Sequence, residues 1–207
     1  MQDEYERLAK SYDKQLKDKL TRNMYVGWRS ELKDTIKKYD TNRGTLLDLG
    51  CGTGITTVPW VGEFDKVIGI ELSKQMLKEA RKKSDKVKWI NQDIVNLKIE
   101  ENADVVTCHF DVLNHILRKR DLQKAFNNVY EILNKDGLFI FDMMSPESFV
   151  WLKNKGKTST LSERSYSKEE IKEMVEKAGF KILKIKKQKT QEWDNKPRRN
   201  IFLVQRG

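Results

Sequence analysis

The chain has 207 residues, which suits one domain with a full hydrophobic core. No apolar run approaches the ~18 residues of a membrane-spanning helix, and charged residues follow Met1, so neither a membrane span nor a secretory signal is expected. Cys51 and Cys108, with His109 and His115, show neither a disulfide framework nor zinc-ligand spacing, which predicts a cytoplasmic protein without a metal.

The formal net charge is +10, from 41 basic and 31 acidic residues. Lys is scattered among Glu and Asp, which favours a solvated surface. Arg, which suits bidentate phosphate recognition, is sparser. RNA nevertheless stays open as a partner, because a basic protein is attracted to nucleic acid.

Apolar residues recur every three or four positions from residue 3 to about 20, which predicts an amphipathic helix. Thr21 to Gly27 break the pattern, and a second helix is expected over Trp28–Tyr39. The turn cluster Asp40–Gly44 then leads into the first strand. Residues 1–40 are expected to form a helical lid on a single domain, 1–207.

The rest of the chain is organised around Leu46–Gly54. Its first four residues predict a short buried strand, and Gly50–Gly54 predict a turn. Glycine adopts backbone conformations that other residues resist and lets a ligand approach the chain closely. In an open α/β sheet, the carboxyl end of the first strand is where a nucleotide-like ligand binds. A helix, cut short or bent by Pro59, is expected over Ile55–Val61.

The second strand, Lys66–Glu71, ends on an acid about twenty residues after the glycines, where a carboxylate can accept from both hydroxyls of a ribose. Ser73 is predicted to cap the next helix. The third strand, Val87–Ile90, leads to Asp93. The fourth, Ala103–Cys108, is apolar enough to be covered on both faces.

The second half of the chain continues the alternation of helices and strands. A polar connector over residues 143–167 has room for a loop or one short strand pair. Ser167 and Glu170 predict a capping box at the start of the following helix. The other expected elements are a helix over Asp121–Leu133, a turn at Asn134–Gly137, a fifth strand over Leu138–Asp142, and β runs at Phe180–Ile185 and Asn200–Val204 joined by the basic segment Lys186–Arg199.

These motifs resemble those of the class I S-adenosylmethionine-dependent methyltransferases. Thr45–Gly54 matches D/E-x-G-x-G-x-G, and Glu71–Leu77 matches D/E-x-S-x-x-M-L. Tyr5–Asp13 resembles the opening segment of many small-molecule methyltransferases, and Asp104–His115 resembles a segment of small, largely uncharacterised bacterial members. The resemblance implies an α/β fold, namely a Rossmann-like seven-stranded, mostly parallel sheet with an antiparallel C-terminal hairpin and helices on both faces.

The resemblance also implies a cofactor, S-adenosylmethionine, with S-adenosylhomocysteine as its product. It places Met76 near the adenine, Asp93 on the adenine amino group and Ile94 over the ring. His109, Asp111 and His115 are candidate catalytic residues, and Asp111 and Asn114 are expected at the substrate mouth. The residues implied to bind the cofactor are Tyr12, Tyr25, Trp28, Asp48, Gly50, Cys51, Gly52, Thr53, Gly54, Glu71, Leu72, Met76, Gln92, Asp93, Ile94, His109 and Phe110.

The predicted function is methyl transfer to a small-molecule nitrogen or oxygen acceptor. An RNA- or ribosome-directed methyltransferase stays open because residues 181–199 are basic. A non-catalytic S-adenosylmethionine-binding module also stays open, because many similar proteins carry a longer, substrate-covering insertion where this chain has 143–167. A NAD-dependent oxidoreductase is the weakest alternative, since Asp93 and the Ser73–Met76 run would then lack a purpose.

Overall fold

The computed structural model describes residues 2–15, 19–154, 163–189 and 197–207. Its centre is a seven-stranded sheet in the order β3-β2-β1-β4-β5-β7-β6. Six of these strands run in one direction, and β7 is antiparallel to both of its neighbours. This confirms the predicted sheet. The strands are β1 (Thr45–Leu49), β2 (Lys66–Glu71), β3 (Lys88–Asn91), β4 (Ala103–Cys108), β5 (Leu133–Met144), β6 (Phe180–Lys189) and β7 (Pro197–Arg206).

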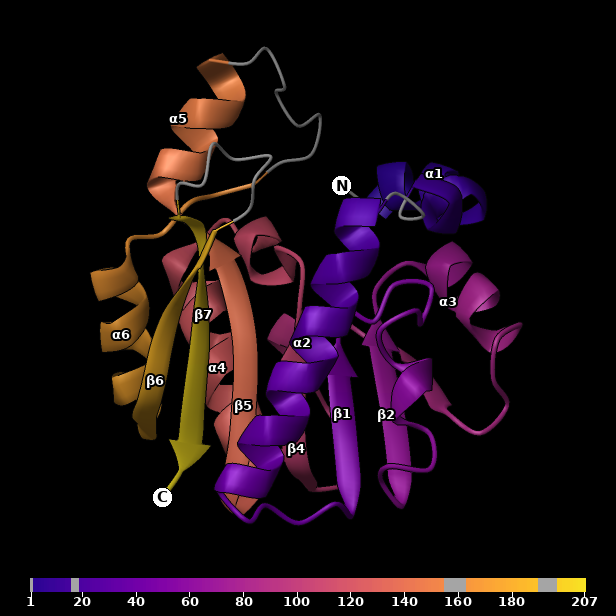
Figure 1. Cartoon of the computed structure of the whole chain (residues 1–207), viewed down its shortest axis with the longest axis horizontal. Helices are drawn as coiled ribbons and strands as arrows, with labels where there is room; N and C mark the ends of the chain where they lie inside the picture. The colour runs from indigo at the N-terminus through magenta and orange to yellow at the C-terminus, as the bar shows by residue number, and fades with distance from the viewer. Residues whose placement is uncertain (1, 16–18, 155–162, 190–196) are drawn as a thin grey trace.

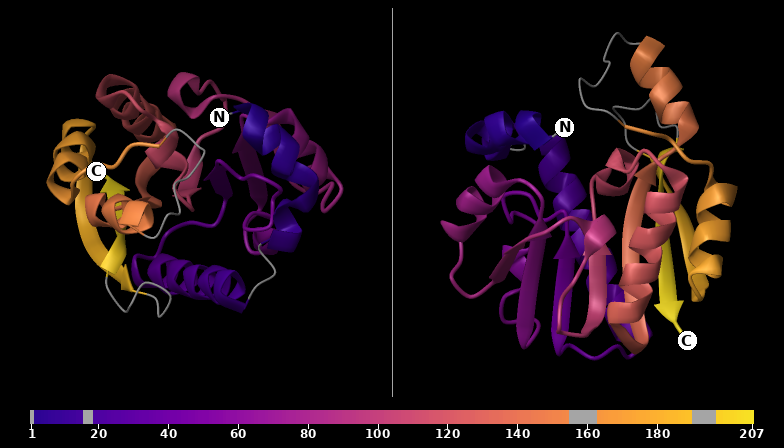
Figure 2. Two further views of the ribbon diagram at one scale, coloured as in Figure 1. Left: turned by 90° about the horizontal axis from the view of Figure 1, so that it is seen from above. Right: turned by 180° about the vertical axis from the view of Figure 1, so that it is seen from behind.

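Helices cover both faces of the sheet. Helix α2 crosses one face, and α4 and α6 lie on the other (Figures 1 and 2). Helices α1 and α5 stand above the edge where the parallel strands end (Figure 1). No helix in the described ranges is both long enough and apolar enough to cross a membrane. The helices are α1 (Gln2–Gln15), α2 (Lys19–Lys38), α3 (Lys74–Arg81), α4 (Lys119–Ile132), α5 (Pro146–Asn154) and α6 (Lys168–Lys177), with short 3₁₀ turns η1 (Val58–Trp60), η2 (Ile94–Asn96) and η3 (Val112–His115).

The sheet separates two hydrophobic cores, because successive side chains of a strand point to opposite faces. On β5, Phe139 and Phe141 face α4 and α6, and Leu138 and Ile140 face α2. Every residue of β4 is buried, as the prediction of a strand covered on both faces requires. The polar residues at the strand ends are therefore held on a rigid frame.

The predicted break at Thr21–Gly27 is wrong, because α2 begins at Lys19 and continues through Gly27. Glycine inside a helix costs about 1 kcal/mol relative to alanine. Trp28, Leu32 and Ile36 are buried against the sheet, and this burial outweighs that cost.

The segment Ile55–Val61 is a set of turns ending in η1, so the prediction of a helix there is wrong. Pro59 has no backbone N–H to donate, which removes a hydrogen bond that an α-helix would need. Gly62 then takes a φ of +85°, which turns the chain toward β2.

The connector forms neither a loop alone nor a strand pair in the described part of 143–167. Strand β5 continues to Met144, and α5 follows it, beginning at Pro146, a residue that suits the first turn of a helix. Strand β5 also begins earlier than predicted, because the expected turn at Asn134–Gly137 is taken up as an irregularity in its pairing with β4. Strands β6 and β7 are likewise longer than predicted.

Candidate functional site

The glycine loop after β1 is closely packed on one side and open on the other. Gly50, Gly52 and Gly54 have φ of +69°, +54° and +76°, which side chains disfavour. A Cβ on Gly50 would lie 2.4 Å from Cγ2 of Val112, and one on Gly54 would lie 2.5 Å from the Trp89 ring. A Cβ on Gly52 would meet nothing within 4 Å. The loop therefore has free space beside its central glycine.

Gly50→Ala is expected to destabilise the protein more than Gly62→Ala, which serves as the matched control. Both positions have positive φ, but no atom lies within 4 Å of a Cβ on Gly62. The clash with the branched side chain of Val112 should add about 1–3 kcal/mol to the strain that both variants share. Urea unfolding measures the difference, and equal losses would show that the contact with Val112 is unimportant.

Asp48, near the end of β1, fixes the chain that follows this loop by side-chain hydrogen bonds. Its carboxylate is buried and accepts hydrogen bonds from the hydroxyls of Thr56 (3.1 Å), Thr57 (2.6 Å) and Thr107 (2.8 Å). A buried carboxylate needs such partners. Asp48 thereby joins the loop to β4.

Glu71, at the end of β2, lies across the same loop. One carboxylate oxygen accepts from the backbone N–H of Gly52 at 3.0 Å, and the other accepts from that of Ser73 at 2.8 Å. Burial raises the pKa of Glu71, and the two N–H groups oppose this rise. Each oxygen keeps lone-pair capacity for a further donor. Ser73 also caps α3 by accepting from the N–H of Met76 at 3.2 Å, which confirms the predicted cap.

Helix α1 is fastened to the loop by Asp13. One oxygen of Asp13 accepts from the hydroxyl of Thr53 at 2.6 Å, and the other pairs with Nζ of Lys83 at 2.6 Å. Lys83 also donates to the carbonyl of Thr53 at 2.6 Å. These bonds hold α1, and with it Tyr12, above the glycine loop.

Glu6 makes a second attachment, which the sequence did not reveal. Its carboxylate accepts from the hydroxyl of Ser73 at 3.1 Å and from the backbone N–H groups of Lys74 (2.9 Å) and Gln75 (3.2 Å). These groups form the N-terminus of α3, where a negative charge is favourable. Acidic residues on α1 thus fix it at two points.

Asp13→Ala is expected to loosen α1 without unfolding the domain. The variant loses the bonds to Thr53 and Lys83, a partly exposed set that contributes about 1 kcal/mol. Hydrogen exchange of the α1 amides should become faster in this variant. The control is Asp34→Ala, at an exposed position on α2, which should leave the exchange rates of the α1 amides unchanged. Unchanged exchange in the Asp13 variant would mean that other contacts hold α1.

The ends of β1, β2, β3 and β4 surround one cavity. Its lining contains three acids, Asp48, Glu71 and Asp93, and no Lys or Arg among the described residues. The predicted cofactor residues that line it are Tyr12, Asp48, Gly50, Cys51, Gly52, Thr53, Glu71, Leu72, Met76, Gln92, Asp93, Ile94, His109 and Phe110. His115, Val112 and Ile116 line it as well.

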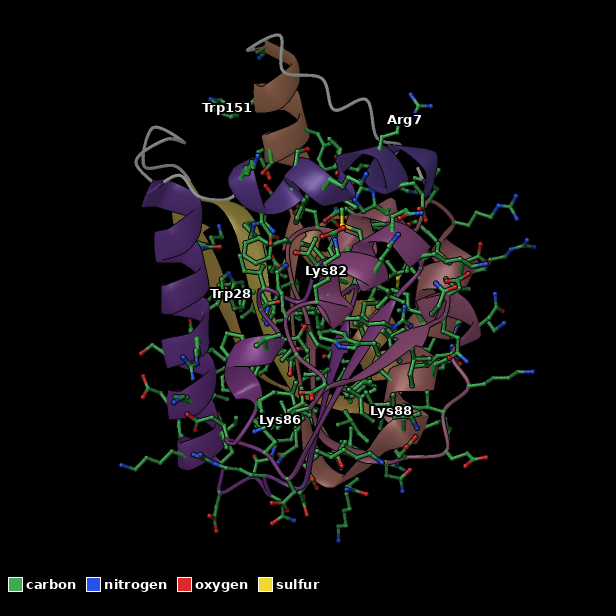
Figure 3. The ribbon with its side chains drawn as sticks, turned by 90° about the vertical axis from the view of Figure 1, so that its right-hand side faces the viewer. Arg7, Trp28, Lys82, Lys86, Lys88 and Trp151 are labelled. Carbon is green, nitrogen blue, oxygen red and sulfur yellow. The ribbon has the colours of Figure 1, made fainter. Side chains whose placement is uncertain are left out.

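Two predicted cofactor residues, Gly54 and Trp28, are absent from this lining. Gly54 packs against Trp89, and Trp28 lies on the inner side of α2 (Figure 3). The Trp28 ring is buried, with its centroid 4.6 Å from that of His109, so it supports the histidine from behind. Tyr25 belongs to α2, but its side chain lies outside the described residues.

His109 is a buried, neutral histidine. Burial lowers its pKa to about 4; Asp48 opposes this shift and Arg199 adds to it. Its Nδ1 has no hydrogen-bond partner among the described residues. The ring lines the cavity, so it offers polar nitrogens there without adding positive charge at neutral pH.

Asp93 is held in place by the chain itself. It caps η2 by accepting from the N–H of Val95 at 2.9 Å, and its other oxygen accepts from the Asn96 side chain at 3.3 Å. Gln92 accepts from the Lys98 N–H and donates to the Lys98 carbonyl, both at 2.9 Å. The loop after β3 is thus braced, with both residues on the cavity wall.

The loop after β4 is held in a strained conformation by Arg199 of β7, a residue that sequence reasoning missed. Phe110 and Asp111 have φ of +59° and +66°. The buried Arg199 side chain donates to Asp111 at 2.8 Å and also to Asp142. Asp142 accepts from the Phe110 N–H at 2.7 Å. Burial raises the pKa of both acids, and in turn these acids raise the pKa of Arg199.

The prediction of Asn114 at the substrate mouth is wrong, because its side chain is fully buried. Its amide accepts from the N–H of Met144 at 3.0 Å and donates to the carbonyl of Arg164 at 2.8 Å. Asn114 therefore joins η3 to β5 and to the segment before α6. Asp111, beside Arg199, is also absent from the cavity lining.

His115 is the second histidine on the cavity wall. Its Nε2 lies 3.6 Å from Oε1 of Glu163, and only 9% of each side chain is exposed. Burial raises the pKa of Glu163 to about 7; Asp111 adds to this shift and Arg199 opposes it. Among the described residues, no three of His, Cys, Asp and Glu gather in a way suited to a metal ion.

Comparison with known sequences agrees with this geometry. Residues 46–137 match the family described as a methyltransferase domain. A protein of Geobacillus sp. (strain WCH70), provisionally named a methyltransferase, is 32% identical over 146 residues, which cover 68% of this chain and 58% of that protein. The demethylmenaquinone methyltransferase of Oceanobacillus iheyensis is 26% identical over 215 residues, 88% of this chain and 87% of its own length. The chain spans a little over half, 53–58%, of the length of the Geobacillus protein and of two other curated relatives, one from Methanocaldococcus jannaschii and one from Bacillus subtilis.

A solved structure extends the likeness to the whole fold. The crystal structure of an S-adenosylmethionine-dependent methyltransferase from Clostridium acetobutylicum ATCC 824 aligns with a TM-score of 0.79 at 25% identity. The alignment covers 95% of this chain and 99% of that one. With the glycine loop, the acid after β2 and the sheet order, these likenesses show that the chain belongs to the class I S-adenosylmethionine-dependent methyltransferases.

Proposed function

We propose that the protein binds S-adenosylmethionine in this cavity and transfers the methyl group to a small-molecule nitrogen or oxygen acceptor. The observation that carries the proposal is the convergence of four strand ends on one cavity. These ends bring the glycine loop, Glu71, Asp93 and His109 together. Each belongs to a motif that the family uses for one ligand.

The residues present fit that cofactor. The open space at Gly52 gives it room beside the backbone, and Glu71 has acceptor capacity left for two adjacent hydroxyls. Lining acids and a neutral His109 suit a ligand that carries a positive sulfonium.

When bound, the cofactor supplies a methyl group that is already activated on sulfur. Glu71 would accept from its ribose, and Asp93 from the adenine amino group, between Met76 and Ile94. Tyr12 on α1 would cover the site, with α1 acting as a lid that excludes water. The chain's contribution is thus orientation and enclosure.

A small-molecule acceptor is favoured over RNA by two observations. The demethylmenaquinone methyltransferase of Oceanobacillus iheyensis, which matches along most of its length, is named for a small-molecule acceptor. Lys184 and Lys186, in the basic stretch that suggested RNA, lie 3.7 Å and 3.0 Å from carboxylate oxygens of Glu31 on α2. These lysines have an intramolecular role.

The test is to supply methyl-tritiated S-adenosylmethionine with a cell extract separated into small molecules, RNA and protein. We expect S-adenosylhomocysteine to form and the label to enter the small-molecule fraction. Label in RNA would overturn the choice of acceptor class. Binding of the cofactor without any turnover on any fraction would favour a non-catalytic binding module.

A further inference from the structure

The cavity differs in charge from the rest of the molecule. The chain carries a net charge of +10, yet the described cavity lining holds three acids and no Lys or Arg. Basic residues lie on the outer surface instead. Around α3 and β3, for example, the exposed residues include Lys82, Lys86 and Lys88 (Figure 3). A cavity lined by one sign of charge concentrates ligands of the opposite sign. This site therefore favours cations.

A second acidic group lies beside the cavity at His115. Glu163 faces Nε2 of that histidine, and Asp111, from the loop after β4, acts on Glu163 electrostatically. In the part of the chain that the structure describes, Arg199 of β7 is the cation that acts on Glu163 and pairs with Asp111, and it also pairs with Asp142 of β5. Three acids thus lie around this arginine, and Glu163 is the one that faces His115.

Glu163 is held there by the fold. The N–H of Arg164 donates to the carbonyl of Asn114 at 2.7 Å, and the Asn114 amide donates back to the Arg164 carbonyl at 2.8 Å. The Tyr166 hydroxyl donates to the carbonyl of Ile116 at 2.6 Å. Bonds on both sides of His115 therefore fix the segment that begins at Glu163 against η3.

We propose that His115, oriented by Glu163, accepts the proton of an amine acceptor, and that the protein methylates amines rather than hydroxyls. This inference rests on the proposed function and names its substrate class. The Glu163 carboxylate beside His115 stabilises an ammonium ion as it binds, whereas it would repel the alkoxide that a hydroxyl acceptor forms.

The acceptor ammonium gives one N–H proton to the neutral His115 ring, and Glu163 stabilises the imidazolium that results. The freed lone pair of the nitrogen forms the new N–C bond to the methyl carbon as the C–S bond breaks, and that bond's electron pair stays on sulfur. His115 later releases the proton to water. Glu163 is a positioning residue, because it acts through His115.

The chain offers a direct readout because it contains two histidines, His109 and His115. Their imidazole signals can be followed by ¹⁵N-resolved NMR in the complex with S-adenosylhomocysteine. Glu163→Gln is expected to lower the pH midpoint of the His115 signal and leave that of His109 in place. Glu163→Asp should restore part of the shift, and Glu169→Gln, at an exposed position on α6, should change neither.

Amine and alcohol probes of equal shape test the substrate class in the same complex. Ethylamine with ethanol, cyclohexylamine with cyclohexanol, and benzylamine with benzyl alcohol are titrated while the His115 signal is followed. We expect the best amine to bind at least about tenfold more tightly than its alcohol, and Glu163→Gln to remove the preference.

Two results would overturn the inference: no amine preference in any pair, or an unchanged His115 midpoint in Glu163→Gln. Circular dichroism shows whether that variant is folded, and Glu163→Asp repeats the test if it is not. Binding of S-adenosylhomocysteine is measured first. If it binds and amines are not preferred, this inference alone fails; if it does not bind, the proposed function fails.

Discussion

Glu71→Ala is expected to weaken S-adenosylmethionine binding at least about tenfold. The variant removes the carboxylate placed between the N–H groups of Gly52 and Ser73, and with it the acceptor for two ribose hydroxyls. Hydrogen bonds to a charged group contribute about 1.5–3 kcal/mol each. Isothermal titration calorimetry measures the loss directly.

The matched control is Glu101→Ala. Glu101 bridges Lys66 and Lys88 at the surface and is absent from the cavity lining, so its loss should leave affinity unchanged. Because burial raises the pKa of Glu71, wild-type affinity should decline on acidification at a higher pH than an ordinary glutamate would give. Full affinity in Glu71→Ala would remove this residue from the site.

Arg199→Ala is expected to destabilise the protein by about 3–5 kcal/mol, because it leaves buried acids without their cation. Arg199 is the bridge between Asp111 and Asp142, and through them it holds the strained backbone at Phe110. Urea unfolding measures the loss. Arg120→Ala, at a side chain that is 76% exposed, is the control and should change stability little.

The pH dependence of this variant has a defined sign. Burial raises the pKa of Asp111 and Asp142, so without Arg199 the folded state binds more protons than the unfolded state. Its stability should therefore rise as the pH falls toward the ordinary range of aspartate. The triple variant that adds Asp111→Asn and Asp142→Asn should recover part of the loss at neutral pH. A variant as stable as wild type would show that the cluster contributes nothing.

The parts of the site that the sequence predicted are those encoded in short, continuous runs. The glycine loop, Glu71 and the Ser73 cap each lie at one strand end, and the fold brings such ends together. The seven-stranded sheet was predictable for the same reason, since apolar runs alternate with patterned helices. The predicted start of the second helix was wrong at Gly27, because burial of the apolar face of α2 outweighs the low helix propensity of glycine.

The parts that could not be predicted depend on pairs far apart in the chain. Arg199 reaches Asp111 across 88 positions, and Glu6 caps α3 across 67 to 69. Neither pairing leaves a local pattern, because only the closed sheet and the docked α1 create it. Asn114 was wrongly assigned to the substrate mouth, because its place in a loop beside the site suggested a ligand contact. Its side-chain amide instead makes hydrogen bonds within the protein.

A crystal structure of the complex with S-adenosylhomocysteine tests the central claim most directly. We predict the ribose hydroxyls on Glu71, the adenine beside Ile94 and Met76, and the sulfur on the His109 side of the cavity, toward His115. An empty cavity in a complex that calorimetry shows to be saturated, or a ligand bound elsewhere on the molecule, would contradict the account.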